Sequence, residues 1–218
     1  MSTMVEEILP GLAQWSAFHE GIGREVYSCF AVSSGTLIDP MEPAEGVEAI
    51  AALGRPRRIV LTNRHHYRHS ARFAAEAGCP VLCQEAGLDH FGDERPVEGY
   101  AFDEQLAADV RALQLGSICA EETALLVDAA DGVLCFGDGL TRDEEGSLTF
   151  MPDRLLGDDP AGVRAGLCRS LRRIHAEEDF DGLLFAHAPA VLEGGHALLG
   201  EFLDRRSAPA AARPVPIL

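Results

Sequence analysis

A short apolar run that ends in a cluster of histidines and arginines constrains the fold of this chain most strongly. Residues 59–61 read Ile-Val-Leu, and the sequence continues Thr-Asn-Arg-His-His-Tyr-Arg-His-Ser. Such a run, bounded by polar residues, is typical of an interior strand of an α/β sheet. Because ligands of open α/β sheets gather beyond the carboxyl ends of the strands, we expect the histidines after residue 61 to lie at a functional site.

Apolar periodicity along the rest of the chain predicts a single α/β domain. Residues 5–37 indicate a β-meander, and further strands are expected at 58–61, 80–83, 110–115, 124–127, 133–136 and 183–185. Helices are expected at 43–53, 67–77, 160–175 and 195–203. This order fits a four-layer αββα sandwich that spans residues 1–206. The Ala- and Pro-rich tail, 207–218, is expected to be poorly ordered unless it docks on a partner.

Charge and composition exclude several classes of partner. The chain has 35 acidic and 18 basic side chains, a formal net charge of -17, which would repel nucleic acid. No apolar run approaches the ~20 residues that a membrane span needs, and the acidic start, 1–7, does not resemble a signal peptide. The six scattered cysteines are typical of reduced core thiols. We therefore expect a cytoplasmic protein without nucleic-acid or membrane partners, and the oligomeric state is left open.

The histidine-rich segment resembles the signature loop of the metallo-β-lactamase superfamily. In that family a strand ending in Leu-Thr is followed by His-x-His-x-Asp-His, which carries ligands for two zinc ions. When the chain is aligned on its own Leu-Thr at 61–62, Asn63 takes the place of the first histidine and His65 that of the second. Tyr67 and Arg68 then stand at the aspartate and the third histidine. A shifted register that uses His66 and His69 puts Arg68 at the aspartate.

The resemblance extends over nearly the whole chain, with the glyoxalase-II-like group as the nearest subgroup. Residues 34–40 are similar to an early family strand that ends in an aspartate, here Asp39, which is chiefly structural in the family. Residues 133–138 are similar to the strand whose Gly-Asp carries the carboxylate that bridges the two metals, here Asp138. Residues 180–189 place His187 at the last ligand position, whereas Ser117 stands where the family has a histidine.

The resemblance therefore implies a degenerate metal site. Of seven expected ligands only His65, Asp138 and His187 remain, and they are drawn from both metal positions, so neither zinc would keep the three protein ligands usual for catalytic sites. The neighbouring Glu121 and Glu122 are expected to be exposed. We expect the cleft to be formed by these residues: Asn63, His65, His66, Tyr67, Arg68, His69, Ser117, Asp138 and His187.

Two functional hypotheses follow. In one, the protein hydrolyses a small ester, thioester or related substrate with a single Zn, Fe or Mn held by His65, Asp138 and His187. In the other, the metals are lost, and the cleft binds a small molecule or a protein partner. Arg68 favours the second, because a guanidinium at a former ligand position repels a cation and is expected to neutralise Asp138 through a charge-assisted hydrogen bond. Whether the protein is an enzyme, and what its ligand is, the sequence leaves open.

Overall fold

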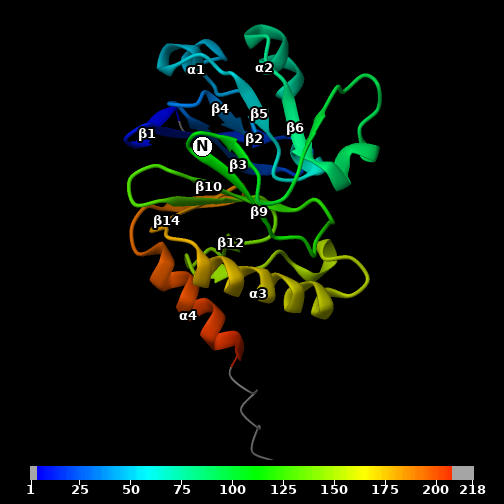
Figure 1. Cartoon of the computed structure of the whole chain (residues 1–218). Helices are drawn as coiled ribbons and strands as arrows, with labels where there is room; N and C mark the ends of the chain where they lie inside the picture. Colours follow the sequence, from blue (N-terminus) through cyan, green and yellow to red (C-terminus); the bar gives the residue numbers. More distant parts are fainter. Residues whose placement is uncertain (1–3, 208–218) are drawn as a thin grey trace, which may run out of the picture.

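Two β-sheets packed face to face, with helices on both outer faces, make up the fold. A computed structural model describes residues 4–207 and shows the two sheets between an upper pair of helices, α1 and α2, and a lower pair, α3 and α4 (Figure 1). This arrangement confirms the predicted αββα sandwich. The tail predicted at 207–218 lies outside the described residues, apart from Ser207 at the end of α4.

The first sheet has seven strands that follow chain order. They are β1 (Glu6–Leu9), β2 (Leu12–His19), β3 (Arg24–Ala31), β4 (Thr36–Ile38), β5 (Arg58–Val60), β6 (Val81–Gln84) and β7 (Glu98–Tyr100). Neighbours from β1 to β4 pair antiparallel, as in the predicted meander, and those from β4 to β7 pair parallel. Helix α1 (Glu48–Leu53) connects β4 with β5, and α2 (Ser70–Ala77) connects β5 with β6.

The second sheet has six strands in the order β15-β14-β11-β10-β9-β8. Their bounds are β8 (Gln105–Ala107), β9 (Val110–Gln114), β10 (Thr123–Val127), β11 (Val133–Phe136), β14 (Gly182–Phe185) and β15 (Ala188–Val191). Helix α3 (Pro160–Glu177) precedes β14, and α4 (Gly195–Ser207) follows β15. A small two-stranded sheet is formed by β12 (Thr141–Arg142) and β13 (Leu148–Thr149). The described residues also contain three 3-10 helices: η1 (Arg64–His66), η2 (Glu85–His90) and η3 (Asp153–Leu155).

Apolar side chains fill three separate layers, and strand β5 shows why the sequence folds this way. Ile59, with Leu61 just beyond the strand, packs toward α1 and α2, whereas Val60 packs into the core between the two sheets. Alternate residues of a strand point to opposite faces, so a strand covered on both faces has an uninterrupted apolar sequence. A third cluster joins the second sheet to α3 and α4. No helix within residues 4–207 is long and apolar enough to cross a membrane.

Two of the predicted helices begin later than expected. The helix predicted at 43–53 starts at Glu48, and the one predicted at 67–77 starts at Ser70. In the second case the histidine-rich segment forms η1 first, and Asn63 caps it by accepting a hydrogen bond from the backbone N–H of His65. The sequence after β5 thus forms a tight turn before the helix, and this turn decides which histidine faces the site.

Candidate functional site

Four strand ends bring the candidate site together at one edge of the sandwich. Asp39 directly follows β4, Thr62 lies shortly after β5, Asp138 after β11 and His187 after β14. Strand β4 is parallel to β5 and β11 is parallel to β14, so each pair ends at the same edge of its sheet. Asp39 and Arg68 have positive φ values, 46° and 44°, which are rare for residues with a side chain and cluster at functional sites.

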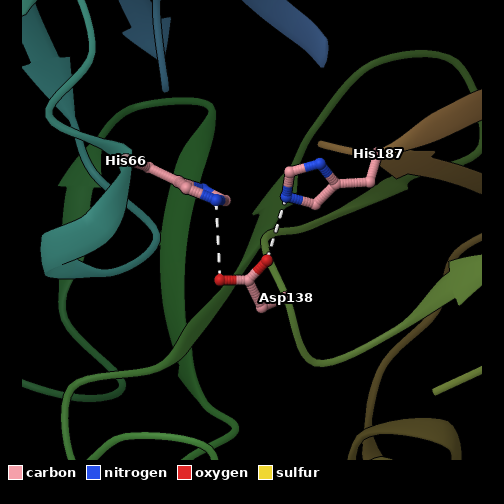
Figure 2. Close-up of side chains that lie close together, drawn as sticks. All are labelled: His66, Asp138 and His187. Atoms are coloured by element: carbon pink, nitrogen blue, oxygen red, sulfur yellow. Dashed lines mark ion pairs between the residues drawn. The ribbon is translucent and has the colours of Figure 1, made fainter. Parts of the chain in front are cut away.

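Asp138 lies between two imidazole rings at the centre of the site, as Figure 2 shows. One carboxylate oxygen of Asp138 is 2.9 Å from His187 Nε2, and the other is 3.6 Å from His66 Nε2. The two rings contact each other edge to face, with centroids 5.3 Å apart. One ligand atom from each of the three residues lies within 4.8 Å of the others, and His65 is not part of this group.

A second carboxylate orients His66 from behind. Its Nδ1 lies 2.8 Å from Asp39 Oδ2, and Thr62 fixes that carboxylate through its backbone N–H (2.8 Å) and its hydroxyl (2.6 Å). Burial disfavours a charged imidazole, but the attraction of Asp39 and Asp138 outweighs it and raises the pKa of His66 to about 9. His66 is therefore an imidazolium at neutral pH that links two carboxylates. Asp39, expected to be structural, orients the ring that faces Asp138.

Asn63 and Glu122 form a hydrogen-bonded layer beneath Asp138. The Asn63 side-chain amide donates to Glu122 Oε2 (2.8 Å) and to Asp138 Oδ2 (3.1 Å). Glu122 Oε1 accepts the backbone N–H groups of Asp138 (2.9 Å) and Gly139 (3.0 Å). Burial, helped by the charge of Asp138, raises the pKa of Glu122 to about 8. At the family's first histidine position this chain thus presents an N–H donor, which cannot bind a metal ion.

The exposure expected for Glu121 and Glu122 is wrong, since both are fully buried. Glu121 accepts two hydrogen bonds, of 2.8 and 3.0 Å, from Arg64 Nη1. Glu122 is held by the contacts given above. Two adjacent acidic residues suggest a solvated turn, but here the segment before β10 carries their carboxylates into the interior, where each finds donors. An unpaired buried carboxylate would be costly, so these donors are what make burial possible.

Arg68 lies inside the site, but it does not bind Asp138 as predicted. Its Nη1 donates to the backbone oxygens of Tyr27 (2.8 Å) and Asp39 (2.7 Å), and no direct bond to Asp138 occurs within the described part of the chain. The carboxylate is instead bound by His187, His66 and Asn63. Arg68 Nη2 is buried and has no hydrogen-bond partner within residues 4–207. The guanidinium therefore acts on Asp39 and Asp138 through its charge.

Four of the nine residues expected in the cleft lie elsewhere. Asn63 is completely buried below it. Tyr67 is buried against Phe91, with ring centroids 5.8 Å apart, and the His69 ring accepts the backbone N–H of Glu42 at 3.0 Å. Ser117 packs against α3, so closely that a methyl group on Gly166 would lie 2.2 Å from its hydroxyl. The residues that do line the pocket are His65, His66, Arg68, Asp138 and His187.

The pocket above Asp138 has a volume of about 590 Å³. Its walls include side chains that the sequence analysis did not assign to a site, among them His19, Ile22, Arg24, Met151, Arg154 and Leu155. They come from the β2–β3 hairpin and from the segment around η3, far apart in the sequence. No motif marks these positions, because only the packing of the two sheets brings them to one cavity.

The described residues offer one group of side chains that fits a metal ion. His66, Asp138 and His187 offer a two-histidine, one-carboxylate set, and Asp39 is placed to fix the tautomer of His66, as outer-shell carboxylates do at metal sites. A second ion would need ligands at positions that hold the donor amide of Asn63 and the buried guanidinium of Arg68. Within residues 4–207, the three ligand atoms that lie together are thus those of His66, Asp138 and His187.

Comparisons with known proteins agree with this architecture. A metallo-β-lactamase from Erythrobacter litoralis, solved with β-mercaptoethanol in its active site, has a TM-score of 0.64 and 15% identity, covering 92% of this chain and 96% of its own. FIM-1 from Pseudomonas aeruginosa, in its mono-zinc form, has a TM-score of 0.65 and 12% identity, covering 94% and 96%. A flavoprotein from Thermotoga maritima has a TM-score of 0.66 and 11% identity, covering 93% of this chain and 61% of its own.

At such low sequence identity, the similarity to these three structures shows only that the chain shares their fold. No curated protein is similar enough to count as a match. A family model described as the metallo-beta-lactamase superfamily matches residues 5–205, which is nearly all of the part that the structure describes. The chain therefore belongs to the metallo-β-lactamase superfamily.

Proposed function

We propose that this protein binds a small molecule in the pocket above Asp138 without a metal ion. The observation that carries the proposal is Arg68, whose guanidinium is held inside the site by the backbone oxygens of Tyr27 and Asp39. A guanidinium stays protonated in proteins, so this charge is permanent and repels a divalent cation. A buried cation is retained only where anions compensate it, and here Asp39 and Asp138 do so.

The charges of the inner site balance without a metal. Asp39 and Asp138 carry negative charge, since their partners lower both pKa values despite burial. His66, with a pKa of about 9, and Arg68 carry positive charge. Burial lowers the pKa of His187, so this ring is neutral at neutral pH. Two carboxylates thus face two cations, and a proton on His66 together with the guanidinium takes the place of the divalent charge.

The shape of the pocket supports a small molecule more than a protein partner. Its volume of about 590 Å³ lies within the range of roughly 300–1,000 Å³ that is usual for small-molecule sites. The walls mix apolar side chains, such as Val26 and Met151, with a few charged groups, which is the composition that fixes the orientation of a ligand. Five of the nine residues that the sequence analysis expected in the cleft line this pocket, which supports the proposal.

One arrangement favours a second candidate, a hydrolase that uses a single metal ion. The Nε2 atoms of His66 and His187 flank Asp138, and all three ligand atoms lie within 4.8 Å of one another. An ion held by these residues would act as a Lewis acid and lower the pKa of a water molecule. Asp39 would orient His66 for this role. The candidate requires that His66 give up its proton and that the ion tolerate the charge of Arg68.

Metal analysis separates the two candidates. Protein purified without added metal or chelator is expected to contain well under one equivalent of Zn, Mn or Fe. Titration with Zn²⁺ or Mn²⁺ is expected to leave the thermal unfolding temperature unchanged, and β-lactams and glutathione thioesters should show little turnover. Stoichiometric metal that is lost in His187→Ala and retained in His90→Ala, a substitution at an exposed histidine on η2, would overturn the metal-free proposal, and metal-dependent turnover of an ester or thioester would establish the one-metal hydrolase.

A further inference from the structure

The charged lining of the pocket has the opposite sign to the protein as a whole. The chain carries a formal net charge of -17. The pocket nevertheless exposes the arginines Arg24, Arg68 and Arg154 together with four histidines, and the carboxylate that it contains is Asp138. That carboxylate already has three hydrogen-bonding or ionic partners. The pocket is therefore a basic cavity within an acidic protein, and such cavities attract anions.

Two of these arginines are not engaged by carboxylates. Arg24 donates a long hydrogen bond, 3.5 Å, to the backbone oxygen of His187. Arg154 lies on η3 beside Asp153, but the carboxylate of Asp153 pairs with Arg164 on α3. Within residues 4–207, no carboxylate oxygen lies within 4.0 Å of either Arg24 or Arg154. Both guanidinium groups therefore keep N–H donors that no carboxylate of residues 4–207 takes, and both border the same pocket, so an external anion can bind them together.

The same pocket has an apolar part. Ile22 and Leu155 line it and are among the few large hydrophobic side chains that are exposed, at 52% and 50%. Val26, Ile118 and Met151 continue the apolar surface inward. Exposed apolar side chains that border a cavity are stabilised when a ligand covers them. The ligand should therefore carry an apolar chain or ring next to its charged group.

We propose that the pocket binds a small organic anion, a carboxylate or phosphate monoester that carries an apolar chain or ring. Arg24 and Arg154 bind the anionic group, and Ile22 and Leu155 contact the apolar group. The inference rests on the proposed function, because it assigns the class of molecule that the same pocket takes. A guanidinium can bind a carboxylate or a phosphate through two parallel N–H donors, and this favours these two groups over other anions.

Calorimetry with matched probes tests the proposal on the full chain. Octanoate and octyl phosphate are expected to bind, octanamide to bind roughly tenfold more weakly, and inorganic phosphate to bind weakly, since each of the latter two lacks one part of the ligand. The relative affinities of the two acids show whether carboxylate or phosphate is preferred. Raising the ionic strength should reduce the advantage of octanoate over octanamide, because the arginines are partly open to solvent.

Variants then place the bound anion. Arg24→Gln and Arg154→Gln should each weaken the binding of octanoate roughly fivefold, which is the scale of an exposed ion pair. Both variants should leave the affinity for octanamide unchanged. Arg205→Gln, on α4 outside the pocket, is the charge control and should change the affinity for neither octanoate nor octanamide. Leu155→Ser should weaken both octanoate and octanamide, whereas Leu53→Ser, at another exposed leucine, should not.

The results that would overturn the anion proposal differ from the result that would overturn the proposed function. Equal affinities for octanoate and octanamide, with no effect of the two arginine variants, would overturn the anion proposal and leave metal-independent binding in place. Absence of binding by both octanoate and octyl phosphate would overturn it as well. Binding that appears only with a stoichiometric metal ion would overturn the proposed function itself.

Discussion

Removal of the Arg68 side chain should destabilise the fold by about 3 kcal/mol. Breaking a buried charge pair by deleting one partner costs roughly 3–5 kcal/mol, because the remaining charge stays buried and uncompensated. Here the remaining charges are Asp39 and Asp138, whose negative charge Arg68 offsets. Two details favour the lower end of the range. Arg68 also borders the pocket, and the Asp39 backbone oxygen keeps a second hydrogen bond, 2.9 Å, from the Ser28 hydroxyl.

Arg68→Ala isolates the guanidinium, since alanine keeps the Cβ and hence the strain of a positive φ of 44°. Urea and thermal unfolding measure the effect, and for a domain of 218 residues the unfolding temperature should fall by roughly 6–12 °C. Arg68→Lys keeps a positive charge, so its free energy of unfolding should fall less than that of Arg68→Ala. Arg205→Ala removes an exposed arginine that pairs with Glu201 and should change little. If Arg68→Ala unfolds like the wild type, the site does not depend on this cation, and Arg68 does not take the place of a metal ion.

Two further predictions concern the residues around Asp138. Because the pKa of His66 rises from 6.5 to about 9 on folding, its stabilisation is complete below pH 6.5 and is lost as the pH rises to about 9. Urea unfolding across this window should show a loss on the order of 3 kcal/mol that is missing in His66→Gln, when both proteins also carry Glu122→Gln, because Glu122 titrates near pH 8 and His66 lowers its pKa. If the free energies of unfolding of the two proteins change in parallel with pH, the predicted contribution of His66 is wrong. Gly137→Ala should cost about 1–3 kcal/mol, because a Cβ there would lie 2.4 Å from the Thr62 hydroxyl, whereas Gly92→Ala, with open space around it, should cost far less.

The fold was predictable because burial leaves a direct record in the sequence. The strand predicted at 133–136 forms as β11, and all of its residues are buried. Among the elements that sequence reasoning missed are two short strands at the sheet edges, β7 and β15. Strand β7 contains Gly99, and β15 contains Pro189, two residue types that weaken or interrupt a strand pattern. Their pairing with β6 and β14 comes from tertiary packing, which local periodicity does not report.

The site was harder to predict, because a tight turn decides which neighbouring side chain faces inward. An alignment on Leu61-Thr62 selects His65 as the retained histidine, yet in the 3-10 turn η1 the ring that meets Asp138 belongs to His66. With three residues per turn, adjacent positions of such a helix point about 120° apart, so His65 and His66 both line the pocket but only His66 meets Asp138. Asp39 distinguishes the two histidines in the structure, because its carboxylate contacts the His66 ring in addition to Thr62.

Asp138 shows how a retained residue can take a different set of partners when its surroundings change. In the resemblance drawn from the sequence, this carboxylate bridges two metal ions, so it must face strong positive charge. Here it faces N–H donors from His187 and Asn63 and the charge of His66. Each partner binds at a distance of 2.9 to 3.6 Å, and together they satisfy both oxygens. Restoring a histidine at one position, such as Arg68→His, would therefore add a ligand atom without removing these donors. A single reversion should not restore zinc binding, because the donors from Asn63 and the protonated His66 would still compete for the same oxygens.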